Sequence, residues 1–247
     1  MPVLVEACID TVASAVAAER AGAGRVELCA ALADGGTTPS AGMIAAVRAA
    51  VRIPVFVIVR PRGGGFVYSA AELDVMGRDI DAAVRQEVDG IVLGVLHADG
   101  RVDVARTRAL VYAASGLPVT FHRAFDGAPD LHDALDALID AGVTRVLTSG
   151  GAPTALAGVD TIAALVARAG ERLTVMAGGG LRESHVADVV RHGGVGEVHV
   201  RGTRLETAPG TRRPVRLRKA LPDDEGAWEE TDDGRVREFV RRVTEVR

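Results

Sequence analysis

The stretch PVTFHRAFDGAPDLHDALDALIDAGVTRVLTSG (residues 118–150) contains one complete structural cycle. Short apolar runs at its two ends predict strands, and the segment 130–142 between them carries leucines and an isoleucine at helical spacing. Asp130 can cap the start of this helix, and Gly142 can adopt the left-handed conformation just beyond its end. The stretch therefore predicts a strand, a helix and a second strand.

The same cycle repeats along the chain, each strand beginning about 20 to 35 residues after the last. The predicted strands are LVEACI at 4, RVELCA at 25, VFVIVR at 55, GIVLGVL at 90, PVTFHRA at 118, RVLTSG at 145, LTVMAGG at 173 and EVHVRGT at 197. Eight strands alternating with helices in 247 residues predict an α/β protein, a (β/α)8 or TIM barrel. A doubly wound sheet fits less well, because no Gly-x-Gly-x-x-Gly follows the first strand.

We predict a single domain over residues 1–247, with the strand and helix repeats over about 1–203. A C-terminal extension over about 204–247 begins as a charged, proline-containing loop and ends in a closing helix from about residue 234.

The net charge of −4 is spread without blocks of one sign, which argues against a nucleic-acid or membrane-surface partner. No run approaches the roughly 18 apolar residues of a membrane span. The start, MPVLVEACID, lacks the features of a secretory signal, so we expect a cytoplasmic protein with free thiols at its two cysteines. The expected partner is a metal ion or a small anionic molecule.

Alternation within each strand predicts which side chains point into the barrel, because the outer row must be apolar to pack on the helices. The inner row then contains Glu6, Cys8, Glu27, Cys29, Arg60, Thr120, His122 and His199. These residues come late in their strands, so we expect them at the C-terminal mouth, where barrel enzymes place their chemistry.

Two interpretations fit these buried charges. In the first, Glu6 and Glu27 form a structural layer of ion pairs with Arg60 and Arg62, and the histidines hydrogen-bond within it. In the second, Glu6, Glu27 and His122 are catalytic as general acid and base, or hold a divalent metal ion with His122 as the third ligand.

Cys8 and Cys29 occupy matching positions in adjacent strands, so we expect them to be neighbours. A pair of thiolates suits Cu(I), which prefers soft ligands. No Cys-x-x-Cys is present, and buried cysteines also serve as small hydrophobic residues.

Two glycine-rich loops are candidate anion sites. Gly178, Gly179 and Gly180 follow the seventh strand and precede a helix, in the region where barrels bind phosphate. The loop 60–66, RPRGGGF, carries two arginines that could clamp an anion. The alternatives are a tight strand exit for the first loop and a simple connector for the second.

Several of these segments resemble the CutC family, barrel proteins named for a proposed part in copper homeostasis. The matching segments are RVELCAALADGGTTPS, VIVRPRGGGFVYS, VTFHRAFD, RVLTSGG and VMAGGGLRESHV, in this order. The resemblance covers all eight strands and, more loosely, the closing helix. It implies a cytoplasmic TIM barrel, a homo-oligomer, with copper ion binding as its role.

By position, the resemblance assigns the metal-binding cysteines to Cys8 and Cys29. It assigns the polar mouth to Glu6, Glu27, Arg60, Arg62, His122, Arg123, Asp126 and His199. Two positions depart from the family pattern. Ile9 stands where some relatives have a second cysteine, and Val200 and Arg201 stand where small hydroxyl residues are usual; Arg201 favours an anion.

The first functional hypothesis is therefore copper homeostasis through Cu(I) bound by cysteine thiolates. The alternative is an isomerase, epimerase or lyase acting on a small anionic sugar or sugar phosphate. In that case the glycine loop at 178–180 and the arginines, Arg201 among them, bind the anion. A non-catalytic scaffold is a third possibility, since fold alone does not fix function.

Overall fold

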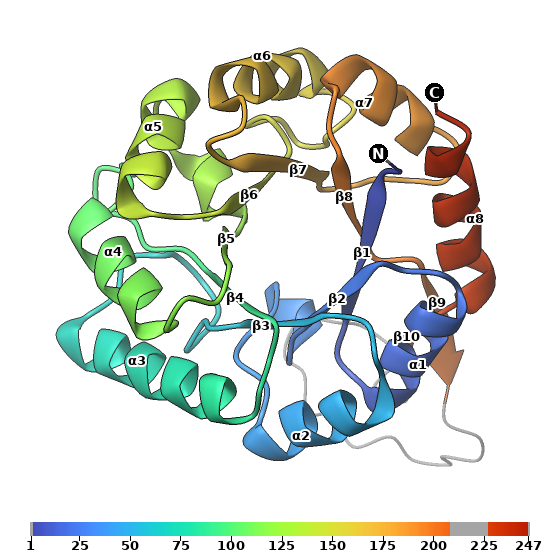
Figure 1. Cartoon of the computed structure of the whole chain (residues 1–247), viewed down its shortest axis with the longest axis horizontal. Coiled ribbons are helices and arrows are strands. Elements are labelled where there is room, and N and C mark those ends of the chain that lie inside the picture. The colour runs from blue at the N-terminus through green and yellow to red at the C-terminus, as the bar shows by residue number, and fades with distance from the viewer. Residues whose placement is uncertain (1, 208–226, 247) are drawn as a thin grey trace.

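A computed structural model describes residues 2–207 and 227–246. Eight parallel strands close into a barrel in sequence order, and helices surround it (Figure 1). The predicted (β/α)8 barrel is confirmed. The strands are β1 (Leu4–Ile9), β2 (Arg25–Leu28), β3 (Val55–Ile58), β4 (Gly90–Leu93), β5 (Val119–Phe121), β6 (Arg145–Thr148), β7 (Thr174–Gly178) and β8 (Glu197–Val200). The helices are α1 (Val12–Arg20), α2 (Ala41–Ala50), α3 (Ala70–Arg85), α4 (Val104–Ala113), α5 (Leu131–Ala141), α6 (Val159–Ala169), α7 (Val186–Gly193) and α8 (Asp233–Thr244).

Local sequence signals set the helix ends. Asp130 caps α5 by accepting hydrogen bonds from the backbone N–H groups of His132 and Asp133, at 2.8 and 3.0 Å. Gly142 ends the same helix with φ of 83°, as predicted. At α3, Ser69 and Glu72 form a capping box, in which the side chain of each residue accepts a hydrogen bond from the backbone N–H of the other.

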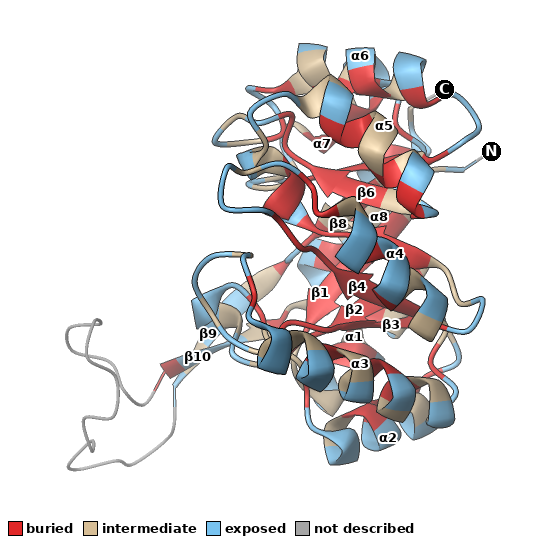
Figure 2. Cartoon of the chain, turned by 90° about the vertical axis from the view of Figure 1, so that its left-hand side faces the viewer, coloured by how far each residue is buried: buried red, intermediate tan, exposed pale blue. Residues whose placement is uncertain are grey.

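The apolar residues form two separate groups, one on each side of the barrel wall. The larger group joins the outer rows of the strands, such as Val5, Ala7 and Val57, to the helices. A small inner group consists of Cys8, Cys29, Phe56, Ile58 and Val92. Figure 2 shows the buried strands inside helices whose outer faces are exposed. The predicted alternation of inward and outward side chains is therefore confirmed in these strands.

The C-terminal extension contains a hairpin that the sequence did not predict. Strands β9 (Thr203–Thr207) and β10 (Ala227–Thr231) pair antiparallel, and they project from the barrel in Figure 2. Most of the predicted proline-containing loop falls at 208–226, outside the described residues. The closing helix is present as α8, which contacts β1, α1 and α7. Among the described residues, no helix is both long and apolar enough to cross a bilayer.

Candidate functional site

A layer of ion pairs crosses the barrel interior near the N-terminal ends of the strands, which we call the lower part of the barrel; the upper part lies toward their C-terminal ends. The Arg25 guanidinium donates hydrogen bonds to Glu6 and, at 2.5 Å, to Glu197. Arg145 donates to the two carboxylate oxygens of Glu197 at 2.6 and 3.1 Å. Both guanidinium groups also lie over the ring of Phe56, at 4.8 and 5.3 Å from its centroid. The charged groups of this layer all have opposite partners, as buried charges require.

A structural ion-pair layer therefore exists, but its predicted partners are wrong. Strand register places Arg25 directly beside Glu6, so the arginine of the neighbouring strand pairs with this carboxylate. Arg60 and Arg62 come after the end of β3 and bond elsewhere. Arg25, Arg145 and Glu197 were not predicted for this layer, although inward alternation places Arg25 two residues before Glu27 and Glu197 two residues before His199.

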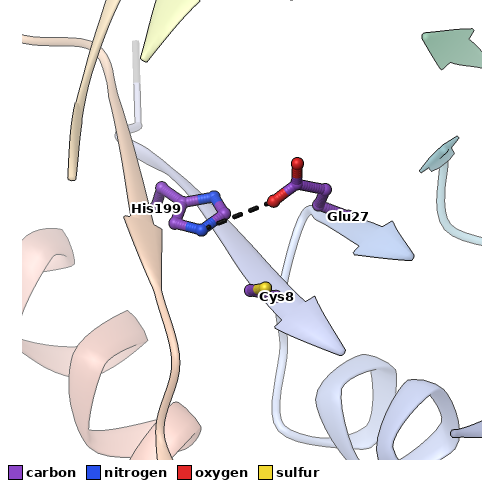
Figure 3. Close-up of side chains that lie close together, drawn as sticks. All are labelled: Cys8, Glu27 and His199. Atoms are coloured by element: carbon purple, nitrogen blue, oxygen red, sulfur yellow. Dashed lines mark ion pairs between the residues drawn. The ribbon is translucent and has the colours of Figure 1, made fainter. Parts of the chain in front are cut away.

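Above this layer, Cys8, Glu27 and His199 come together from β1, β2 and β8 (Figure 3). One possible ligand atom from each residue lies within 4.8 Å of the others. His199 is held by Glu6, whose carboxylate is 2.7 Å from Nδ1, and its Nε2 lies 3.5 Å from the Glu27 carboxylate. The Sγ atoms of Cys8 and Cys29 are 3.9 Å apart, which confirms that the cysteines are neighbours.

The charges of this cluster are strongly shifted by its burial. Desolvation raises the pKa of Glu6, but Arg25 and His199 outweigh it and bring the pKa to about 2. Burial raises the pKa of Glu27 to about 8, against the attraction of His199. Burial also acts to lower the pKa of His199, yet its bonds to Cys8 and Glu6 raise it well above the usual value. The site thus holds an imidazolium next to Glu6.

The two thiols are unequal. The hydrogen bond with Cys29 lowers the pKa of Cys8 to about 5, opposed by burial and assisted by His199. The pKa of Cys29 is raised by the hydrogen bond to Cys8 and by burial. A thiolate at Cys8 that accepts a hydrogen bond from the Cys29 thiol accounts for both directions.

His122 and Arg60 are not members of this cluster, and neither pairs with a carboxylate among the described residues. Nδ1 of His122 accepts a hydrogen bond from the Ala124 N–H at 3.2 Å, and burial together with Arg60 lowers the pKa of His122 to about 3. A neutral imidazole that accepts at Nδ1 carries its proton on Nε2. The guanidinium of Arg60 donates to the carbonyls of Asp34, Gly36 and Gly64 at 2.7 to 2.9 Å.

This part of the mouth has buried polar atoms without partners. Nε of Arg60 and Nε2 of His122 have no hydrogen-bond partner among the described residues. The Phe66 ring lies between their side chains, 4.9 Å from the His122 ring and 5.2 Å from the Arg60 guanidinium carbon. The structure groups Glu27 with His199 rather than with His122, so it does not assemble the predicted divalent set of Glu6, Glu27 and His122.

Arg62, Arg123 and Asp126 are committed to local contacts. Arg62 is 42% exposed and pairs with Glu72 at 2.5 Å, away from the inner row. Asp126 accepts hydrogen bonds from the loop after β6, including the Ser149 N–H at 3.0 Å, and pairs with Arg123 at 2.8 Å. Asp126 therefore holds the loop after β6 in place, and its negative charge is paired with Arg123.

The glycines after β7 permit close approaches. Gly179 has φ of 102°, and a Cβ there would lie 3.0 Å from the Arg123 guanidinium carbon. Residues 181–185 separate Gly180 from α7, so the glycines are not at the N-terminus of that helix. Arg201 follows β8 and pairs with Glu229 at 2.6 Å.

Comparison with known proteins agrees with this architecture. The family model described as CutC family matches residues 3–204. The CutC family protein of Xanthomonas axonopodis pv. citri (strain 306) is 45% identical over 96% of this chain and 97% of its own length. The copper homeostasis protein cutC homolog of Mus musculus is 43% identical over 95% of this chain and 87% of its own length.

A solved structure is also similar. The crystal structure of CutC from Streptococcus agalactiae superimposes with a TM-score of 0.77 at 37% identity, and covers 80% of this chain and 97% of its own. The family match over residues 3–204 includes β1, β2 and β8, which carry Cys8, Glu27 and His199. The chain belongs to the CutC family.

Proposed function

We propose that this protein takes part in copper homeostasis by binding Cu(I) through the thiolates of Cys8 and Cys29. The main support is the 3.9 Å separation of the two Sγ atoms. Two sulfurs bound at about 2.3 Å to one tetrahedral metal ion are about 3.8 Å apart, so both thiolates can reach the same ion without a large rearrangement. The copper homeostasis name of the mouse relative points to the same metal.

The neighbouring groups fit a soft metal ion. His199 is oriented by Glu6 through Nδ1, which leaves Nε2 on the side of Cys8 and Glu27. A metal-binding histidine is commonly fixed by such a carboxylate on its other nitrogen. Cys8 lies beside both Cys29 and His199, and a metal ion bound here would displace the protons of its ligands, that of Nε2 of His199 included. Sulfur and imidazole donors suit Cu(I) better than ions that prefer oxygen.

The decisive experiment is a Cu(I) titration of the reduced protein against a competing chelator. The Cys8→Ser, Cys29→Ser double variant is expected to lose tight binding, because both sulfur ligands are removed. Glu27→Gln serves as the matched control from the same cluster and is expected to retain it, since a carboxylate is a poor Cu(I) ligand. Unchanged affinity in the double variant would contradict the thiolate site.

A second candidate function is catalysis by an isomerase, epimerase or lyase on a small anionic sugar or sugar phosphate. It is favoured by the buried Nε of Arg60 and Nε2 of His122, which lack partners and can both donate to an oxyanion. A panel of sugar acids and phosphorylated sugars should then raise the melting temperature. The rise should shrink in His122→Gln. An absence of any shift across the panel argues against this candidate.

From the family resemblance we also expect a cytoplasmic homo-oligomer. Light scattering coupled to size-exclusion chromatography tests the assembly, and cell fractionation tests the location.

A further inference from the structure

An open cleft of about 200 Å³ lies at the mouth of the barrel, between the segments that follow β7 and β8 and the helix α8. Its lining includes Gly180, Leu181, Arg182, Arg201, Gly202 and Arg235. This volume is below the roughly 300 to 1,000 Å³ of pockets that enclose a whole drug-sized ligand, so it suits one compact chemical group.

The lining is rich in positive charge. Arg201 and Arg235 are paired with Glu229 and Glu183 at 2.6 Å each, which fixes the positions of their guanidinium groups. Arg182 is exposed and has no ion pair with any described residue. Asp10 also acts on Arg201 and Asp232 on Arg235, so Arg182 is the arginine of this lining that has no ion-pair partner among the described residues. Planar guanidinium groups match the oxygens of phosphate.

The backbone of the cleft is also prepared for an acceptor. Within the described residues, the N–H groups of Gly180, Leu181 and Gly202 donate no hydrogen bond. Gly180 has φ of 66°, a conformation that glycine adopts without strain and that turns the chain at this point. These N–H groups and arginines follow the seventh and eighth strands, the region in which barrels frequently bind phosphate.

We propose that this cleft binds the phosphate group of a small phosphate monoester, held by Arg182, Arg201 and the N–H groups of Gly180, Leu181 and Gly202. Arg201 lies two residues beyond His199, which corresponds to a rise of about 7 Å along the strand direction. The remainder of such a ligand can therefore extend toward the Cys8, Glu27 and His199 cluster. This proposal rests on the second candidate function in one respect: it assigns the phosphate group of that function's substrate to this cleft.

The test is a calorimetric titration of inorganic phosphate, the first probe, into the full, metal-free, reduced chain. Sodium chloride at matched ionic strength corrects for general screening. Arg182→Gln and Arg201→Gln are each expected to weaken phosphate binding about tenfold, because each removes a charge-assisted hydrogen bond. Arg52→Gln is the control, since Arg52 is exposed and lies before β3, at the opposite end of the barrel.

Amide NMR spectra place the ligand. Phosphate should shift the amide protons of Gly180, Leu181 and Gly202 in the wild type, and ribose 5-phosphate should do the same whereas ribose should not. The Cys8→Ser, Cys29→Ser variant should bind phosphate normally, which separates this site from the copper proposal. An absence of saturable binding at millimolar phosphate, or equal affinity in both arginine variants and the wild type, would overturn the assignment.

Discussion

The lower and upper parts of the barrel interior differ in how completely their polar groups are paired. In the lower layer, Arg25 and Arg145 share the carboxylates of Glu6 and Glu197, so charge is balanced inside the barrel. In the upper part, sulfur, imidazole and carboxylate atoms converge, and buried nitrogens of Arg60 and His122 lack partners. Complete pairing serves stability, whereas polar atoms left without partners cost stability unless a ligand completes them.

The largest expected effect comes from breaking the lower layer. Glu197→Gln removes the carboxylate that Arg25 and Arg145 share, so two buried guanidinium groups lose a counter-charge. We expect the free energy of unfolding to fall by about 3 to 5 kcal/mol in urea denaturation. Asp74→Asn removes an exposed pair with Arg78 and should cost at most about 1 kcal/mol. Similar losses in both variants would show that burial of the layer does not matter.

The next effect tests the link between the two parts. Glu6 bonds to Arg25 below and to His199 above, so Glu6→Gln keeps the shape but removes the charge that orients the imidazole. We expect Cu(I) affinity to fall about 10- to 100-fold, the usual result of altering a carboxylate behind a metal ligand. Circular dichroism checks that the variant is folded. Wild-type affinity in a folded variant would show that His199 does not contribute to the site.

A smaller, pH-dependent effect separates His122 from the charged layer. The pKa of His122 is about 3 in the folded chain, below its ordinary value of 6.5, because of burial and Arg60. The unfolded chain therefore binds more protons between these values, so the stabilisation is complete above pH 6.5 and is lost as the pH falls toward 3. His122→Gln should flatten this decline by about 1.4 kcal/mol per pH unit. Parallel stability curves for the two proteins would contradict a buried neutral His122.

Much of this molecule follows from local sequence. The eight apolar runs predicted the eight barrel strands, since a strand buried between a core and a helix layer must be apolar on its outer row. The same alternation placed Cys8 and Cys29 on the inner face of neighbouring strands, and their Sγ atoms are 3.9 Å apart, although the strand register sets Cys8 opposite Glu27 and not opposite Cys29. The resemblance to the CutC family was visible in the same segments and is confirmed by comparison.

The partners of the buried charges did not follow from the sequence. Alternation showed that Glu6 points inward, but only the register of β1 between β2 and β8 places Arg25 and His199 on either side of it. Arg62 was predicted at the mouth as part of the loop 60–66, yet it pairs with Glu72 at the surface, a contact made across the loop that precedes α3.

The sequence by itself thus determined the barrel, the inner rows and the proximity of the two cysteines, because these depend on short-range periodicity. Only the tertiary structure decided which charges meet, since that depends on how eight strands are staggered around a closed barrel. The same holds for the arginine cleft, whose residues Arg182, Arg201 and Arg235 come from separate segments and meet only when α8 packs against β1 and α7.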